Sequence, residues 1–235
     1  MNLLLFTPEE RRPDGTVAVG DRRLQHLREV HGKKPGERVR AGELGGLMGD
    51  AEIVSLSENE ALLRPSLHTS PPGKLPLILV VALPRPKMLR RVLRSAAEQG
   101  VAEIRLLHSY RVEKSYWQTP VLKEATIREY LLQGLQQSRD TILPRVSCER
   151  RFKPFVEDTL PGLTRGRRAL LAHPGDHPPC PRGIAAPTVL VIGPEGGFIP
   201  YEVEKLQQAG CETVSLGPRI LRVETAVTAL VARLF

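Results

Sequence analysis

The chain has 235 residues, of which 41% are hydrophobic, and it carries a formal net charge of +8. This length suffices for one large domain or two modest ones, and the hydrophobic content supports a packed core. No stretch approaches the roughly 18 uninterrupted apolar residues of a membrane span, and the opening MNLLLFTPEERR turns polar too early for a signal peptide. We therefore expect a globular cytoplasmic protein with no membrane partner.

Short strand-like segments and one helix make up the first third of the chain. The helix is predicted at residues 21–30, with Asp21 as its N-cap. Prolines, serines and a glycine interrupt every pattern at residues 64–76, which we interpret as a linker. The predicted strands are residues 3–6, 16–19, 37–40 and 51–56. This order favours a small β-barrel-like domain of about 70 residues.

Strands and helices alternate after the linker. The predicted strands are residues 77–83, 103–107, 169–172, 188–192 and 212–216. The predicted helices are residues 87–99, 119–138, 201–209 and 224–235. Repeated βα units predict an α/β fold with a mostly parallel sheet, in which ligands gather beyond the carboxyl ends of the strands.

The positive charge is concentrated in the middle third of the chain. Residues 73–153 carry 16 Lys and Arg against 7 Asp and Glu, whereas the segments on either side are close to neutral. A clustered basic surface is typical of proteins that meet nucleic-acid phosphates. The alternative is a solvated basic face that serves only solubility.

The stretch VLVIGPEGGFIPYEVE, residues 189–204, leads from a strand through a glycine-rich turn into a helix. A phosphate loop is excluded because no lysine and hydroxyl follow the glycines, and the glycine spacing does not fit a dinucleotide fingerprint. The glycines instead allow the backbone to approach a ligand closely, and Glu195 suits a neutral or cationic one. The alternative is a tight structural turn that starts the next helix.

A second irregular loop lies one βα unit later, in SLGPRILRVETAVTAL, residues 215–230. It places Ile220 and Leu221 between two arginines before the last helix. Two such loops at the ends of predicted strands favour a pocket over two unrelated turns.

Together, IGPEGGF and LGPRILRVETA resemble the RsmE family of SPOUT methyltransferases, and the resemblance covers nearly the whole chain. It implies methylation of N3 of a uridine in 16S ribosomal RNA of the small (30S) subunit, with S-adenosyl-L-methionine as cofactor. It also implies a PUA-like RNA-binding β-barrel domain at residues 1–72 and a SPOUT methyltransferase domain with a C-terminal trefoil knot at residues 73–235. Members of this family are homodimers whose active site lies near the subunit interface.

The resemblance further implies a cofactor site in three loops of the knot. The cofactor-binding residues that it implies are Leu171, His173, Pro174, Ile192, Gly193, Pro194, Glu195, Gly196, Gly197, Leu216, Gly217, Ile220, Leu221 and Arg222. No metal is expected, because His173, His177 and Cys180 have ligand-like side chains but lack a fourth partner.

The chemistry of uracil suggests two catalytic residues. N3 carries a proton that must leave, or its anion must be stabilised, before the nitrogen attacks a methyl group. Arg222 and Glu224 are the strongly polar groups where the last helix begins, so one is a candidate to accept the proton and the other to stabilise the uracil oxygens. The alternative for either residue is helix capping or an ion pair between subunits.

Candidate RNA contacts lie in both predicted domains. Arg139 stands at the position of an arginine in the family's CGR motif, although this chain reads QSR there. The complete set is Arg11, Arg12, Lys87, Arg90, Arg91, Arg94 and Arg139. Two other functions stay open: methylation of another RNA, such as transfer-RNA ribose, and a non-catalytic RNA-binding role in ribosome assembly.

Overall fold

The computed structural model of the protein describes residues 2–30 and 32–235. The chain divides into two compact units. Unit 1 comprises Met1–Gly73 and Leu132–Leu143, and unit 2 comprises Lys74–Leu131 and Pro144–Phe235. Among the described residues, no helix is long and apolar enough to cross a membrane.

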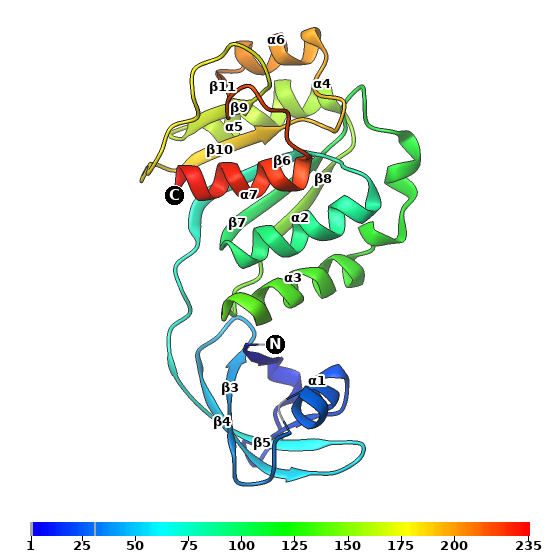
Figure 1. Ribbon diagram of the computed structural model, residues 1–235, viewed down its shortest axis with the longest axis vertical. Coiled ribbons are helices and arrows are strands. Elements are labelled where there is room, and N and C mark those ends of the chain that lie inside the picture. The colour runs from blue at the N-terminus through cyan, green and yellow to red at the C-terminus, as the bar shows by residue number, and fades with distance from the viewer. Residues whose placement is uncertain (1, 31) are drawn as a thin grey trace. The chain divides into compact units, whose positions relative to one another are not determined.

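Unit 1 is built on a five-stranded sheet with the order β1-β3-β4-β5-β2 (Figure 1). β1 pairs with β3 in parallel, and the other neighbours are antiparallel. The strands are β1 (Leu4–Phe6), β2 (Val17–Val19), β3 (Arg38–Glu43), β4 (Met48–Leu56) and β5 (Ala61–Thr69). Phe6, Leu27, Ile53 and Leu63 are fully buried and form the centre of the core of this unit.

The helical part of unit 1 follows β2. The predicted cap is confirmed, because Asp21 Oδ1 accepts a hydrogen bond of 2.8 Å from the backbone N–H of Arg23. The predicted single helix changes character at His26, where α1 (Arg22–Gln25) passes into one turn of π-helix, η2 (His26–Val30). A short 3₁₀ turn, η1 (Pro8–Glu10), precedes β2.

The prediction of a linker over residues 64–76 is wrong for most of that range. β5 continues to Thr69 in antiparallel pairing with β4, and β6 begins at Leu75. The hydrogen bonds between paired strands come from the backbone and not from side chains. The second half of β5 therefore remains a strand although its side chains are mostly exposed. Only residues 70–74 lie between the two strands.

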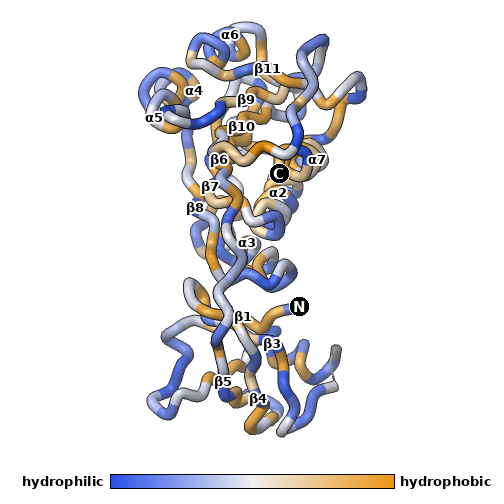
Figure 2. Tube along the Cα trace, turned by 90° about the vertical axis from the view of Figure 1, so that its left-hand side faces the viewer, coloured by the Kyte–Doolittle hydropathy of each residue, from blue (hydrophilic) through white to orange (hydrophobic). Residues whose placement is uncertain are grey.

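Unit 2 contains a six-stranded sheet with the order β11-β9-β10-β6-β7-β8, and all of its neighbours are parallel. The strands are β6 (Leu75–Ala82), β7 (Val101–Leu107), β8 (Arg145–Glu149), β9 (Arg168–Ala172), β10 (Thr188–Ile192) and β11 (Glu212–Val214). The central strands β6 and β10 are hydrophobic along their length and almost wholly buried (Figure 2). The predicted α/β fold with a parallel sheet is confirmed.

Helices cover both faces of this sheet (Figure 2). α2 (Pro86–Glu98) and α7 (Val223–Leu234) lie side by side on one face, where Ser95 Oγ and Thr228 Oγ1 are 2.9 Å apart. α4 (Phe152–Pro154) and α5 (Leu160–Thr164) lie on the other face, joined by the π-helical turn η5 (Phe155–Thr159). α6 (Pro200–Gln208) follows β10.

The helix predicted at residues 119–138 is shorter than expected. α3 spans Glu124–Ser138 and crosses from unit 2 into unit 1. Two 3₁₀ turns precede it, η3 (Lys114–Gln118) and η4 (Pro120–Leu122). The backbone of Lys123 is extended, with ψ of 135°, and this separates η4 from α3.

The long connection between β9 and β10 runs against the C-terminal part of the chain. The backbone N–H of Cys180 donates to Ser215 O at 2.8 Å, just beyond β11. Further along the same connection, the N–H of Ile184 donates to Leu234 O at 2.6 Å, at the end of α7. The last βα unit, which consists of β11 and α7, is therefore hydrogen-bonded near both of its ends to the β9–β10 connection.

Candidate functional site

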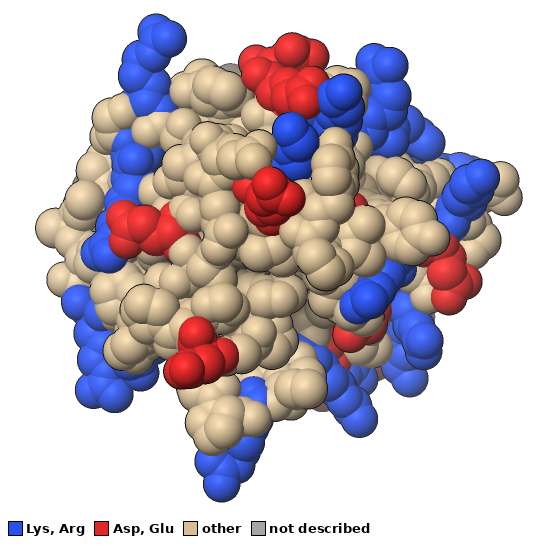
Figure 3. Space-filling view, turned by 90° about the horizontal axis from the view of Figure 1, so that it is seen from above, with Lys and Arg blue, Asp and Glu red and all other residues tan. Residues whose placement is uncertain are grey.

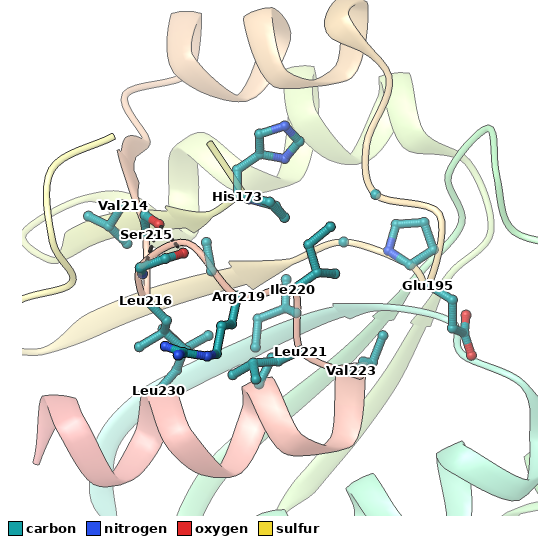
Figure 4. Close-up of a pocket in the computed structure, with 18 residues that line it drawn as sticks. His173, Glu195, Val214, Ser215, Leu216, Arg219, Ile220, Leu221, Val223 and Leu230 are labelled. Atoms are coloured by element: carbon teal, nitrogen blue, oxygen red, sulfur yellow. Dashed lines mark hydrogen bonds between the residues drawn. The ribbon is translucent and has the colours of Figure 1, made fainter. Parts of the chain in front are cut away.

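A cavity opens beyond the carboxyl ends of the neighbouring strands β9, β10 and β11 (Figure 4). It contains about 660 Å³ of empty space, including the part open to solvent. The lining residues are Ala172, His173, Pro174, Ile192, Gly193, Pro194, Glu195, Gly197, Val214, Ser215, Leu216, Gly217, Arg219, Ile220, Leu221, Val223, Ala226 and Leu230. Most of this lining is apolar side chain or glycine backbone.

The turn after β10 forms one wall of the cavity, and two of its positions favour glycine for different structural reasons. A Cβ atom on Gly193 would lie 3.1 Å from Phe198 Cδ2 and 3.2 Å from the backbone nitrogen of Phe198. Gly197 has φ of 73°, and its N–H closes the turn on Pro194 O at 2.8 Å. The sequence of this turn is thus constrained by packing and by backbone conformation before any ligand is considered.

Glu195 lies at the rim of the cavity, and its carboxylate points away from the centre (Figure 4). Its Oε1 accepts a hydrogen bond of 3.0 Å from the backbone N–H of Arg85, the residue before α2. The expectation that this carboxylate suits a neutral or cationic ligand stays a prediction. In this structure, its hydrogen bond holds the turn against the start of α2.

A buried carboxylate fixes the other end of the same turn. Glu202 is 3% exposed and accepts from the backbone N–H of Ile199 at 3.1 Å and of Tyr110 at 2.7 Å. Arg111 Nη1 also donates to Gly196 O. Because bonds to a buried carboxylate are strong, the segment around Tyr110 is anchored to the turn.

The loop after β11 forms the opposite wall. Gly217 has φ of 106°, and its N–H donates to the Oγ of buried Ser215 at 3.1 Å. Ile220 is 81% exposed and Leu221 is 38% exposed, so two large apolar side chains border the opening. Such exposure is unusual for a loop without a ligand or partner.

Three lining residues come from α7, namely Val223, Ala226 and Leu230. None of these three residues was among the site residues predicted from the sequence. Their spacing of three and four residues is that of one helical face, but periodicity alone does not tell a core face from a cavity wall.

The structure separates the predicted cofactor residues into two groups. Eleven of them line the cavity, and they are His173, Pro174, Ile192, Gly193, Pro194, Glu195, Gly197, Leu216, Gly217, Ile220 and Leu221. Leu171 is fully buried inside β9, while Gly196 and Arg222 are exposed residues next to the lining. The lining residues that the sequence analysis did not name adjoin the same loops or belong to α7.

The two candidate catalytic residues lie at the start of α7. Arg222 is the N-cap residue, is exposed, and its guanidinium has no hydrogen-bond or ion-pair partner among the described residues. Glu224 Oε1 lies 3.4 Å from Arg91 Nη1 of α2, and the glutamate side chain is only 13% exposed. This ion pair lies within one chain and differs from the ion pair between subunits that was one alternative for these residues.

The basic residues of α2 differ in their surroundings. Arg90 and Arg94 lie over the ring of Tyr130 in α3, with guanidinium carbons 5.8 and 5.5 Å from its centroid. Lys87 is exposed, and Arg91 pairs with Glu224. These four cations lie on the solvent side of α2, whose other side is buried.

The candidate RNA contacts of unit 1 are of two kinds. Arg11 donates to Glu43 Oε2 and Arg12 Nη2 lies 2.8 Å from Glu60 Oε2, so both are paired with carboxylates. Arg139 is exposed and has no partner among the described residues. The sequence alone does not distinguish the arginines that pair with carboxylates from Arg139.

His173 and His177 lie close together beside the cavity, with ring centroids 5.8 Å apart. Burial, followed by the proximity of His177, lowers the pKa of His173 from its usual 6.5. Among the described residues, no group of three His, Cys, Asp or Glu side chains is placed to hold a metal ion.

The end of unit 2 that carries α6 has few charges near its centre (Figure 3). A broad uncharged area is interrupted by a few acidic and basic side chains, and most basic side chains lie near the outline of this view. This end therefore offers no continuous basic surface.

Comparison with known proteins finds relatives along almost the whole chain. The ribosomal RNA small subunit methyltransferase E of Treponema pallidum is 29% identical over 99% of this chain and 90% of its own length. The enzyme of the same name from Synechocystis is 27% identical over 98% and 76%. A solved structure of this methyltransferase from Neisseria gonorrhoeae, bound to S-adenosyl methionine, matches with a TM-score of 0.75 and 22% identity over 98% of this chain and 95% of that one.

The parallel sheet with a glycine-walled cavity beyond three strand ends defines an α/β protein with a candidate ligand-binding site. The family model described as an RNA methyltransferase domain matches residues 71–235. The chain belongs to this RNA methyltransferase family and, as its two loop motifs predict, to the RsmE family within it.

Proposed function

We propose that the protein methylates N3 of a uridine in 16S ribosomal RNA of the small subunit, with S-adenosyl-L-methionine as the methyl donor. The observation that carries the proposal is the cavity at the ends of β9, β10 and β11, walled by the two family motifs. Relatives named as small-subunit ribosomal RNA methyltransferases support the substrate. A ribosomal substrate also supports a cytoplasmic location.

The cavity fits a ligand of the chemistry of S-adenosyl-L-methionine. Among the described residues that line the cavity, Arg219 is the only Lys or Arg, so the cavity does not resemble a polyphosphate site. A Cβ atom on Gly197 or Gly217 would meet no atom within 4 Å, which leaves their backbone open to close approach. When bound, this cofactor supplies an electrophilic methyl group on a sulfonium. The loops at residues 171–174, 192–197 and 216–222 would hold it.

The residues at the start of α7 have the chemistry that uracil N3 requires. The N3 proton must be accepted before the nitrogen becomes a good nucleophile. The guanidinium of Arg222, which has no partner within the described part of the chain, is suited to stabilising the negative charge on the uracil oxygens. Glu224 is the carboxylate at the same helix start, and Arg91 orients it. We assign Glu224 as proton acceptor and Arg222 as stabiliser of the anion.

The C-terminal chain of unit 2 is the proposed trefoil knot of the domain at residues 73–235. The proposal is supported by the bonds of Cys180 to Ser215 and of Ile184 to Leu234, which join the β9–β10 connection to the last βα unit. For residues 1–72, the five-stranded sheet supports the PUA-like RNA-binding assignment.

A second copy of the chain is the proposed partner at the mouth of the cavity. Exposed Ile220 and Leu221 would be covered in a homodimer whose active site lies near the subunit interface. The RNA would run along the solvent side of α2, at Lys87, Arg90, Arg91 and Arg94.

A methyl-transfer assay tests the proposed function. Purified protein is incubated with radiolabelled S-adenosyl-L-methionine and 30S particles, or free 16S RNA, from cells that lack the protein. We expect 3-methyluridine in the digested RNA, with one methyl group per molecule. Label found in a ribose or in transfer RNA would show that the proposed substrate is wrong. Absence of cofactor binding in a calorimeter would reject an enzymatic role.

A further inference from the structure

Unit 1 contains a second pocket, separate from the cavity of unit 2. It lies where β1 begins beside β3, and contains about 730 Å³ of empty space including the part open to solvent. Its lining residues are Asn2, Leu4, Leu27, Lys33, Arg38, Val39, Arg40 and Arg139. Half of these residues are cationic, and none of them is acidic.

Three of the four cations in this pocket have free guanidinium groups. Arg38, Arg40 and Arg139 are exposed and have no hydrogen-bond or ion-pair partner among the described residues. Lys33 differs, because its Nζ lies 3.4 Å from Glu37 Oε1. Three unpaired arginines around one hollow produce a local positive potential that is suited to an anion with several acceptor oxygens.

Carboxylates near the pocket do not form ion pairs with these arginines in the described structure. In the β3–β4 ladder, Arg38 stands opposite Glu52 and Arg40 stands opposite Asp50. The described structure contains no ion pair between the members of either couple, and Glu52 lies 3.9 Å from Arg64 instead. The arginine side chains are therefore available to a ligand.

Arg139 has a backbone conformation that its side chain does not favour. Its φ is 59°, and it is the only non-glycine residue with positive φ in the described part of the chain. It follows the last residue of α3, a position where glycine or asparagine usually takes this conformation. The next residue fixes the turn, since the N–H of Asp140 donates to Leu135 O at 3.1 Å. A strained arginine in place of glycine suggests that its guanidinium has a function.

We propose that this pocket binds a backbone phosphate of the RNA substrate through Arg38, Arg40 and Arg139, with Lys33 at its side. The inference rests on the proposed function, because it takes RNA to be the ligand. It shifts the RNA contact of unit 1 from Arg11 and Arg12, which are paired with carboxylates, to residues of β3 and the end of α3. Phosphate contacts of this kind fix the register of an RNA on a protein without reading its sequence.

The test measures the affinity of the full-length protein for 16S ribosomal RNA from cells that lack the protein, by filter binding over a series of salt concentrations. The variants are Arg38→Gln, Arg40→Gln and Arg139→Gly, alone and combined. A double variant with Arg11→Gln and Arg12→Gln is the control, because it removes similar charge from the same unit. Cofactor affinity is measured by calorimetry on every variant, since that site lies in unit 2.

We expect the combined variant to bind the RNA at least about tenfold more weakly at physiological salt, and the slope of log affinity against log salt to fall by about two. Arg139→Gly is expected to weaken binding while unfolding at the same or a higher denaturant concentration, because glycine relieves the strained φ. A purely structural arginine would not produce this combination. Cofactor affinity should stay within twofold of the wild type in every variant.

Two results would overturn the inference. One is a combined variant with wild-type affinity and salt slope, while the wild type binds and methylates the RNA. The other is a control variant that loses as much affinity as the combined variant, which would indicate a dependence on net charge alone. If the wild-type protein neither binds nor methylates 16S RNA, the proposed function itself fails.

Discussion

Arg91 of α2 and Glu224 of α7, which are 133 positions apart in the chain, form an ion pair with 3.4 Å between Nη1 and Oε1. The sequence analysis gave these residues separate roles, as a phosphate contact and as a candidate catalytic group. Their pairing connects the basic face of α2 to the entrance of the cavity. An RNA phosphate that engages Arg91 would thereby alter the surroundings of Glu224.

The Arg91–Glu224 pair is expected to matter more for catalysis than for stability. Glu224→Gln should lower kcat about 100-fold, because the candidate proton acceptor is lost, with cofactor affinity unchanged. Arg91→Ala should change the free energy of unfolding by less than about 1 kcal/mol, since its side chain is 48% exposed. Methyl-transfer kinetics and urea unfolding measure the two effects. Normal turnover in both Glu224→Gln and Arg222→Ala would show that the catalytic assignment is wrong.

A methyl group at Gly193 should impair the cofactor site. In Gly193→Ala, the new Cβ would lie 3.1–3.2 Å from Phe198, so Phe198 must give by a few tenths of an ångström. We expect at least a tenfold loss of cofactor affinity, which corresponds to about 1.4 kcal/mol. Calorimetry on Gly162→Ala is the control, because a Cβ there meets no atom within 4 Å. Equal affinities in the two variants would contradict a role for this wall of the cavity.

Removal of the Glu202 carboxylate should destabilise the protein. Glu202→Ala leaves the N–H groups of Ile199 and Tyr110 without their partner, at an expected cost of about 2–3 kcal/mol. Chemical denaturation monitors the loss. Glu204→Ala, at an exposed position two residues later, should change the free energy of unfolding by less than about 0.5 kcal/mol. A small effect at Glu202 would mean that the turn is not held by this carboxylate.

The lowered pKa of His173 predicts sensitivity to acid. Because burial and His177 disfavour its protonated form in the folded state, the unfolded chain binds a proton more readily as the pH falls below 6.5. The free energy of unfolding should therefore decrease between pH 6.5 and the lower folded-state pKa. A cationic His173 beside the cavity should also repel a sulfonium cofactor. Denaturation and calorimetry from pH 8 to 5 measure the free energy of unfolding and the cofactor affinity. Both should depend less on pH in His173→Gln than in the wild type. The pH dependence should be unchanged in His68→Gln, which alters an exposed histidine of unit 1.

Local sequence patterns were sufficient to predict most strands of the six-stranded sheet. The strand β10 was predicted with the observed bounds, because a strand that is buried on both faces is mostly apolar, and all of its residues except Thr188 are apolar. The α2 helix and its stop at Gly100, which has φ of 77°, were also readable from spacing. β8 was missed because RVSCE is short, half charged or polar, and lies at the edge of the sheet.

The sequence by itself indicated the two turns that line the cavity, since a GPEGG turn and an apolar loop between arginines are unusual within one short stretch of chain. Only the tertiary structure decided where their side chains lie. It directs Glu195 toward the start of α2 and brings Arg91 to Glu224. It pairs Arg11 with Glu43, whereas Arg139 has no partner among the residues that the structure describes. The physical reason is that periodicity and turn chemistry report local conformation and burial, whereas ion pairs and pockets depend on packing between segments that are far apart in the chain.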